Sequence, residues 1–317
     1  MFLSFATPQG SAALTAHPLK TYNRIADSNT EMLLKLRLGL NVAHASLKCL
    51  HCKTSVADGL HALTCKHYHG LTNIRHTTVK YALYGALKQK GFRLELERNL
   101  GNYCNLLPNA DTQPVRRASI TSTSTIDRGK LMDIVRTDVQ SGNTQFIDVT
   151  VVHPDTVAGN AAMQAEKRKQ KLYNSKWSFV AGQQLVPFAI ETGGAWGKQA
   201  VDFISSVAET MRCADEAELP LAYSHNYRRI TERVAVAVQK SVTSHIEYFL
   251  RDQRRQINDG RIASRRADAS ESDSDSDDVS ETTEIRRPGR KFGKKTKSGG
   301  SILGSPSKRV RAAAAAN

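Results

Sequence analysis

Residues 131–152 read LMDIVRTDVQSGNTQFIDVTVV, two strand-like apolar runs separated by a short polar segment. The runs Leu131–Val139 and Thr144–Val152 are rich in valine, isoleucine and threonine, which favour extended structure. The segment Gln140-Ser-Gly-Asn143 contains a glycine and an asparagine, the residues that most readily take the positive φ angles of a hairpin turn. This stretch therefore predicts an antiparallel hairpin around which the other elements are arranged.

Each predicted strand of this hairpin carries one aspartate among apolar residues, Asp133 in the first and Asp148 in the second. Aspartate is depleted in strand interiors, so both positions need an explanation. In a hairpin of this length the start of one strand lies beside the end of the other, an arrangement that suits a shared metal ion. Simple alternation also permits a solvated face for both residues, and the pattern alone does not decide between these interpretations.

After the hairpin, helix and strand alternate. A helix is predicted over 160–174, a buried strand over Leu185–Ile190 and a second helix over Gln199–Met211, with Gly193 and Gly194 turning the chain between the last two. This alternation is typical of an α/β domain.

The first of these helices carries several functional side chains on one face. Glu166, Lys169 and Tyr173 are spaced so that a helix presents them together. Lys167 and Lys171 flank that face. A solvated basic stripe would show the same pattern, so the lysines alone do not identify a site.

Before the hairpin, Arg75–Lys90 has apolar residues at helical spacing and is followed by Gly91, which closes a helix. Phe92–Glu97 alternates strictly and predicts a strand. Glu95 and Glu97 share one face of that strand, so either acid is a candidate for the functional site. The predicted order is therefore helix, strand, two-stranded hairpin, helix, strand and helix.

A group of cysteines and a histidine precedes these elements with the spacing Cys-x2-Cys-x8-His-x3-Cys, which is that of a four-coordinate zinc site. The predicted ligands are Cys49, Cys52, His61 and Cys65. His67 and His69 are alternative ligands in place of Cys65 or His61. Because protein ligands fill all four positions, the pattern predicts a structural Zn²⁺ ion that stabilises a small module touching nucleic acid.

The chain is predicted to have four parts. These are an N-terminal segment with a short helix over 1–45, a CCHC zinc knuckle over 46–74, an α/β domain over 75–251 that ends in a long helix, and a disordered acidic and basic tail over 252–317. The tail is too polar to offset the entropy of ordering. Its basic patches are typical of nuclear-localisation or nucleic-acid-binding segments, so we expect a nuclear protein.

The net charge of +15 and the pI near 9.7 favour a polyanionic partner, of which nucleic acid is the commonest. Charge held only in solvated tails is the alternative explanation. No apolar run is long enough to span a bilayer, and the N-terminus lacks the regions of a signal peptide. We therefore expect no membrane partner and a reducing compartment, in which clustered cysteines bind metal rather than form disulfides.

Several motifs together carry a resemblance to a known family, and their order along the chain is preserved. They are Asp58–Cys65, Arg75-His76, Gly91–Glu97, Asp148-Val-Thr-Val, Glu166–Tyr173, Pro187–Gly197 and Arg233–Gln239. This set resembles the region after the reverse transcriptase in non-LTR retrotransposon-type proteins. In that region a CCHC knuckle leads into a restriction-like endonuclease of the PD-(D/E)xK superfamily.

The resemblance implies a restriction-endonuclease-like αβββαβ core, the element order that the residues predict independently. It implies that Asp133 and Asp148 hold a catalytic Mg²⁺ or Mn²⁺ ion, with Glu97 as an additional acid. Because Thr150 stands where the simple D-x-K motif has its lysine, the resemblance implies a lysine contributed from the helix. Lys169 is the first candidate and Lys171 the second.

The resemblance also implies an activity and a set of partners. The expected function is nicking of target DNA by phosphodiester hydrolysis, with element RNA as a further partner. Arg75 and His76 are expected to contact DNA near the site, and Lys167 and Arg168 to contribute to nucleic-acid binding. Glu191 and the glycine turn that follows it are expected to border the site.

Two departures from the family pattern favour an alternative. The family has Arg/Lys-Pro-Asp before the first metal ligand where this chain has Lys130-Leu-Met-Asp133, and Leu172 alters the basic-Tyr ending of the helix. The polymerase that usually precedes the module is absent from this sequence. The alternative is a non-catalytic, zinc-stabilised nucleic-acid-binding protein of the same origin. A third hypothesis is a nuclear scaffold that acts through the tail.

Overall fold

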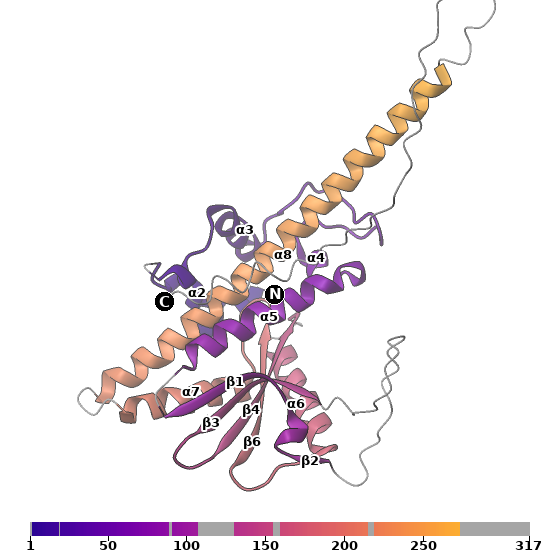
Figure 1. Cartoon of the computed structure of the whole chain (residues 1–317). Helices are drawn as coiled ribbons and strands as arrows, with labels where there is room; N and C mark the ends of the chain where they lie inside the picture. The colour runs from indigo at the N-terminus through magenta and orange to yellow at the C-terminus, as the bar shows by residue number, and fades with distance from the viewer. Residues whose placement is uncertain are drawn as a thin grey trace, which may run out of the picture. The chain divides into compact units, whose positions relative to one another are not determined.

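The computed structural model describes residues 2–18, 20–88, 91–106, 130–154, 159–214 and 219–272 (Figure 1). Two compact units are distinguished, residues 1–263 and residues 264–317. The first unit holds the sheet and all the side chains discussed below. The second is described only over 264–272, where the chain is helical. Most of the predicted acidic and basic tail therefore lies outside the described residues.

A four-stranded mixed sheet forms the centre of the first unit, with the strand order β1-β3-β4-β6. The strands β1, β3 and β4 are antiparallel neighbours, and β6 runs parallel to β4. Their bounds are β1 (Phe92–Asn99), β3 (Leu131–Asp138), β4 (Thr144–Val152) and β6 (Gln183–Glu191). The predicted hairpin and the predicted downstream strand are both confirmed.

The hairpin turn between β3 and β4 differs in one detail from the prediction. Gly142 has a positive φ of 72°, whereas Asn143 does not adopt this conformation. The Asp138 side chain accepts a hydrogen bond from the Gln140 backbone N–H and another from the Ser141 hydroxyl. One left-handed residue is sufficient here because this carboxylate stabilises the first half of the turn.

Helices cover both faces of the sheet. On one face, sheet residues such as Ile147, Val149 and Phe188 share a hydrophobic core with helices α5, α7 and α8. On the other face, α6 packs its small residues Ala162 and Ala165 against β6. The helix bounds are α5 (His69–Ala86), α6 (Asn160–Asn174), α7 (Lys198–Ala214) and α8 (Leu219–Ser272). Burial on both faces explains why β6 is apolar without interruption over Leu185–Ile190.

Shorter elements complete the described chain. In chain order they are α1 (Phe2–Phe5), α2 (Pro8–Thr15), η1 (Thr21–Asn23), α3 (Asp27–Leu38), α4 (Leu60–Thr64), η2 (Lys66–Tyr68), η3 (Leu100–Asn102), β2 (Asn105–Leu106) and β5 (Trp177–Ser178). The short helix predicted in the N-terminal segment corresponds to α3, which ends at Gly39 in the left-handed conformation as expected. In the described residues, no helix is both long enough and apolar enough to cross a membrane.

Three sequence-based predictions about the helices need correction. The N-terminal segment contains two further helices, with Phe5 and Ala12 buried against distant parts of the chain. Helix α5 begins at His69 and ends at Ala86, so it is shifted towards the N-terminus of the predicted Arg75–Lys90. Helix α8 continues through Ser272, and Gln253 is fully buried, so the disordered tail was predicted to begin too early.

In Figure 1, α5 and α8 lie side by side above the sheet, and Arg233 of α8 packs against Gly85 of α5.

Candidate functional site

Three acidic residues occupy one level across three neighbouring strands. The register of β1 and β3 brings Glu97 opposite Asp133. The ladder between β3 and β4 ends at the pair Ile134↔Ile147, and Asp133 and Asp148 are the residues next to that last pair. We call Glu97, Asp133 and Asp148 the acidic row. The two aspartates of the hairpin therefore both lie at the end of the paired ladder.

Regular strand pairing gives way at the acidic row. The Asp133 carboxylate accepts a hydrogen bond from the backbone N–H of Val149 at 2.8 Å and so takes the place of a carbonyl of the ladder. Glu97 has a positive φ of 53°, a conformation that costs on the order of 1 kcal/mol for a residue with a side chain. Departures of this kind concentrate at functional sites, where the surrounding structure holds them in place.

Helix α5 supplies two hydrogen-bond partners to this row, one helical turn apart. His76 Nε2 lies 3.0 Å from Asp133 Oδ2, and Lys80 Nζ lies 2.6 Å from Glu97 Oε1. Burial raises the pKa of Asp133, but the hydrogen bond and charge of His76 outweigh it and leave the pKa lowered. Lys80 is buried, so its ammonium group depends on the Glu97 carboxylate for compensation.

Helix α6 supplies the partners of the third acid. Lys169 Nζ and the Tyr173 hydroxyl both donate to Asp148 Oδ2, each at 2.8 Å. Burial, followed by the charge of Asp148, raises the pKa of Tyr173, so this phenol stays protonated and donates. Lys171 is exposed on the same helix and is not among the partners of the row. The geometry therefore favours Lys169 over Lys171.

The remaining acids near the row have other partners. Glu95 accepts a hydrogen bond from the Tyr103 hydroxyl at 2.6 Å, so Glu97 is the acid of β1 that belongs to the row.

Lys80 was not singled out from the sequence, because its position on a helix face gives no indication of the strand residue that it meets. Its spacing from His76 by one helical turn was the available signal.

Glu166 stabilises the fold instead of joining the acidic row. Its carboxylate accepts hydrogen bonds from the backbone N–H groups of Gln199 and Ala200, each at 3.0 Å, and so caps the start of α7. Burial raises the pKa of this carboxyl group. A Cβ atom at Gly197 would overlap the carboxylate, which explains the glycine immediately before α7.

Replacing Glu166 with alanine is expected to lower the free energy of unfolding by about 2 kcal/mol, because two buried N–H groups lose their acceptor. Urea denaturation followed by circular dichroism measures this change. Gln164→Ala is the matched control, since Gln164 is exposed on the same helix. Equal unfolding midpoints for the two variants would contradict the capping role.

The expected nucleic-acid-binding residues fall into two groups. Lys167 and Arg168 are exposed on α6, as a phosphate contact requires. Arg75 is buried, with 3% of its surface exposed, and it donates to the backbone carbonyl of Leu63. Burial lowers the pKa of Arg75 to about 10. The expected contact of Arg75 with DNA does not fit this position, and His76 is directed at Asp133.

Glu191 and the glycine turn lie away from the acidic row. Glu191 pairs in register with Val152, four residues beyond Asp148 on β4, which corresponds to roughly 13 Å along the strand. One carboxylate oxygen of Glu191 accepts the Ala161 backbone N–H at the start of α6. The expectation that Glu191 borders the site is therefore not supported by this arrangement.

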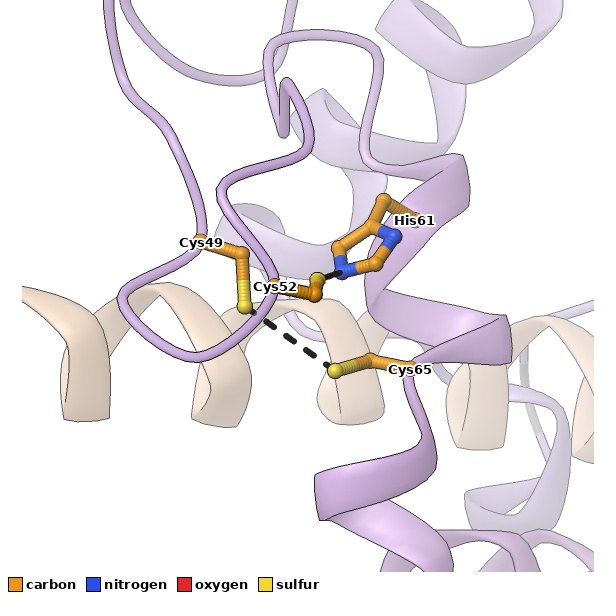
Figure 2. Close-up of side chains that lie close together, drawn as sticks. All are labelled: Cys49, Cys52, His61 and Cys65. Atoms are coloured by element: carbon orange, nitrogen blue, oxygen red, sulfur yellow. Dashed lines mark hydrogen bonds between the residues drawn. The ribbon is translucent and has the colours of Figure 1, made fainter.

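The cysteines and the histidine of the knuckle converge on one point (Figure 2). The ligand atoms of Cys49, Cys52, His61 and Cys65 all lie within 4.8 Å of one another. The Cys49 and Cys65 sulfurs are 3.9 Å apart, close to the ~3.8 Å between two thiolates in a zinc tetrahedron. Cys52 Sγ and His61 Nε2 are 2.9 Å apart. Within the described residues, this is the one group of three or more such side chains that could hold a metal ion such as zinc.

Local structure explains why these side chains meet. The Lys53 backbone N–H bonds to the Cys49 carbonyl at 2.9 Å, and Lys53 has a positive φ of 60°, which closes the tight turn between the first two cysteines. Helix α4 then carries His61 in its first turn and is capped by Cys65. His67 instead stacks on the His51 ring at 4.4 Å, and the His69 side chain lies outside the described residues.

The thiols of this group differ in their acidity. A hydrogen bond from the Thr54 backbone lowers the pKa of Cys52 to about 7. Burial raises the pKa of Cys65 to about 11. Since the thiolate is the form that binds metal, an ion that binds here displaces the proton of Cys65 against this raised pKa.

The knuckle packs directly on α8. The backbone N–H of Leu50 donates to Gln253 Oε1 at 2.8 Å, and Gln253 Nε2 donates to the Tyr68 hydroxyl at 2.9 Å. The Phe249 ring meets the His61 ring edge-on. Cys49 and Cys65 belong to the same hydrophobic core as the sheet and α5. The Cys/His group is therefore part of the main core and not a separately tethered module.

The acidic row presents a different donor set. Asp148 offers a buried carboxylate and Asp133 a partly buried one. Mg²⁺ ordinarily uses one or two protein carboxylates and keeps several water molecules, so this donor set fits a magnesium ion. In this conformation His76 contacts Asp133 Oδ2 and Lys169 contacts Asp148 Oδ2.

Comparison with known proteins adds no identification. No protein-family model matches the chain, and no curated protein matches it either. A functional interpretation therefore depends on the geometry of the acidic row and of the Cys/His group.

Proposed function

We propose that this chain is a metal-dependent DNA endonuclease with a restriction-like core and a structural zinc knuckle, related to non-LTR retrotransposon proteins. The observation that carries the proposal is the acidic row, in which Lys169 and Tyr173 contact Asp148 while His76 contacts Asp133. The element order supports it, because α5, β1, the β3–β4 hairpin, α6 and the parallel strand β6 follow the αβββαβ pattern.

In this proposal Asp133 and Asp148 hold a Mg²⁺ or Mn²⁺ ion. Such an ion supplies positive charge at the scissile phosphate and lowers the pKa of a bound water molecule. Lys169 lies beside Asp148, where its ammonium group positions the attacking water and stabilises negative charge that develops on the phosphate. Position 150 cannot supply this cation, because it is a threonine whose hydroxyl is buried without a partner.

The side chains around these acids have supporting roles. His76 fixes the orientation of Asp133, and the buried phenol of Tyr173 fixes that of Asp148. Lys80 orients Glu97, the additional acid of the row, through a direct hydrogen bond. Exposed Lys167 and Arg168 on α6 would contact the phosphates of a bound strand. DNA is the proposed substrate, element RNA a further partner and the nucleus the proposed location.

A plasmid-nicking assay tests this proposal. We expect the wild-type protein to convert supercoiled plasmid to the open-circular form in Mg²⁺ or Mn²⁺. Asp133→Asn and Asp148→Asn are each expected to reduce the rate at least about a hundredfold, because each removes a charged ligand. A gel-shift assay with the same proteins separates loss of cleavage from loss of binding. Cleavage by both variants at the wild-type rate would overturn the proposal.

The ion pairs of the acidic row favour one alternative, a zinc-stabilised nucleic-acid-binding protein without turnover. Each acid already has a hydrogen-bond partner, Lys80 for Glu97, His76 for Asp133 and Lys169 for Asp148, so each carboxylate is satisfied without a metal ion. If the wild-type protein and both asparagine variants shift DNA equally and none of them nicks it, this alternative replaces the endonuclease.

A further inference from the structure

A basic pocket lies outside the acidic row and the Cys/His group. It has a volume of about 510 Å³ and is formed between residues 17–23 and the part of α8 over 225–232. This volume falls within the ~300–1,000 Å³ range of pockets that hold small ligands. None of the side chains that line it belongs to either of the sites described above. We call it the N-terminal pocket.

Positive charge dominates the lining of this pocket. Lys20, Arg228 and Arg229 face a single carboxylate, that of Glu232, which leaves two positive charges. Arg228 Nε lies 2.6 Å from Glu232 Oε1, so this ion pair neutralises the Glu232 carboxylate. Among the described residues, the Arg229 guanidinium has one hydrogen-bond acceptor, the Met211 sulfur at 3.6 Å, which is a weak acceptor. In the described part of the chain, Lys20 forms no ion pair, so Lys20 and Arg229 remain available to an anion.

The pocket also contains a buried acceptor without a partner. Asn23 is 9% exposed, and its Nδ2 donates to the His17 carbonyl at 3.1 Å. Its Oδ1 is buried with no hydrogen-bond partner among the described residues. Buried acceptors are almost always satisfied in folded proteins, so this oxygen indicates a donor supplied by water or by a ligand.

The wall that carries these groups is anchored to α8. Lys240 Nζ donates to the Tyr22 carbonyl at 3.0 Å, and the Arg233 guanidinium lies 4.5 Å from the centre of the Tyr22 ring. Tyr22 is therefore held against α8, and its neighbour Asn23 is held by the bond to the His17 carbonyl. A site formed in advance loses less conformational entropy when its ligand binds.

We propose that the N-terminal pocket binds a nucleotide phosphate, with Lys20 and Arg229 contacting the phosphate oxygens. Asn23 Oδ1 accepts a hydrogen bond from a sugar hydroxyl or a base amino group of the same nucleotide. The nucleotide is part of a nucleic-acid strand or is free in solution, since both present the same chemistry. In either case the pocket is a second contact for nucleotides, distinct from the proposed cleavage site.

Fluorescence anisotropy with a labelled single-stranded 20-mer tests this inference. The double variant Lys20→Gln/Arg229→Gln is expected to bind about tenfold more weakly at 0.1 M salt, because two charge-assisted contacts are lost. The slope of log K against log salt is expected to become shallower by about 1.4, or ~0.7 for each phosphate contact. The matched control Lys88→Gln/Arg93→Gln removes two exposed charges elsewhere and is expected to bind within about twofold of wild type.

Further arms separate the two sources of phosphate. Calorimetric titration of the wild type and the double variant with AMP and with inorganic pyrophosphate tests for a free ligand. Binding of AMP that the double variant loses identifies a free nucleotide, and an effect confined to the 20-mer identifies a strand. Wild-type affinity and salt slope in the double variant would overturn the inference. If that variant does not fold, as judged by its melting curve, Lys20→Gln alone is expected to reduce the slope by about 0.7.

This result is independent of cleavage. The anisotropy experiment is carried out without Mg²⁺ and repeated in an Asp133→Asn background. Suppose that the wild-type protein does not nick plasmid and that the double variant binds the 20-mer more weakly than wild type. This pair of results would contradict the endonuclease proposal and support the pocket proposal. If the double variant nicks plasmid and binds the 20-mer with wild-type affinity, the endonuclease proposal is supported and the pocket proposal is contradicted.

Discussion

Cys49→Ser is expected to lower the melting temperature by more than about 10 °C and to remove most of the bound zinc. Cys49 is completely buried and, with Cys65, belongs to the core that also contains α5 and α8. Structural zinc sites contribute on the order of 10 kcal/mol of apparent binding free energy, comparable to the whole stability of a domain. Loss of about half of that free energy is sufficient for the shift, at ~2–4 °C for each kcal/mol.

Thermal unfolding and the zinc content of the purified protein are the two measurements for this prediction. A zinc chelator added to the wild type is expected to reproduce the effect. Cys104→Ser is the matched control, because Cys104 is a buried thiol outside the metal-binding group. A Cys49→Ser variant that melts with the wild type and binds the same amount of zinc would show that the four side chains do not form a metal site.

Lys169→Met is expected to reduce the rate of plasmid nicking about 10²–10³-fold, the range seen when one charge-stabilising donor is removed from an active site. Lys169 Nζ contacts Asp148 Oδ2 directly, whereas Lys171 is exposed and takes no part in the row. Lys171→Met is therefore expected to nick within about twofold of wild type. Lys169→Arg keeps the positive charge and is expected to recover part of the rate.

The rates are measured at saturating plasmid, so that a change in DNA affinity does not contribute. Tyr173 still donates to Asp148 in Lys169→Met, so the buried carboxylate keeps one partner and the variant is expected to fold. Its melting temperature provides the check. A larger loss in Lys171→Met than in Lys169→Met would assign the cation to Lys171 and contradict the geometry of α6.

Features that depend on neighbouring residues were predicted well from the sequence. The strand that begins at Phe92, the polar turn of the hairpin and the bounds of α6 at Asn160–Asn174 all agree with the structure. The spacing of the four knuckle ligands predicted the group that converges in the structure. In each case the information lies within a few residues, because backbone propensity, side-chain periodicity and ligand spacing act over that range.

Choices between equivalent neighbours could not be made in this way. Glu95 and Glu97 share a strand face, and Lys169 and Lys171 share a basic helix, so local pattern treats the members of each pair alike. The structure distinguishes the members of each pair, because Tyr103 donates a hydrogen bond to Glu95 and Lys169 donates one to Asp148. Such partners are set by the packing of helices on the sheet.

The sequence by itself determined the order of the α/β elements, the metal-binding group and the two aspartates of the hairpin. Tertiary structure decided that Arg75 is buried, that Lys80 compensates Glu97 and that α8 continues beyond Asp252 to bury Gln253. The physical reason is the same in each case. A charged or polar side chain is stable in the interior only when a partner far away in the sequence satisfies it, and chain folding alone brings that partner near.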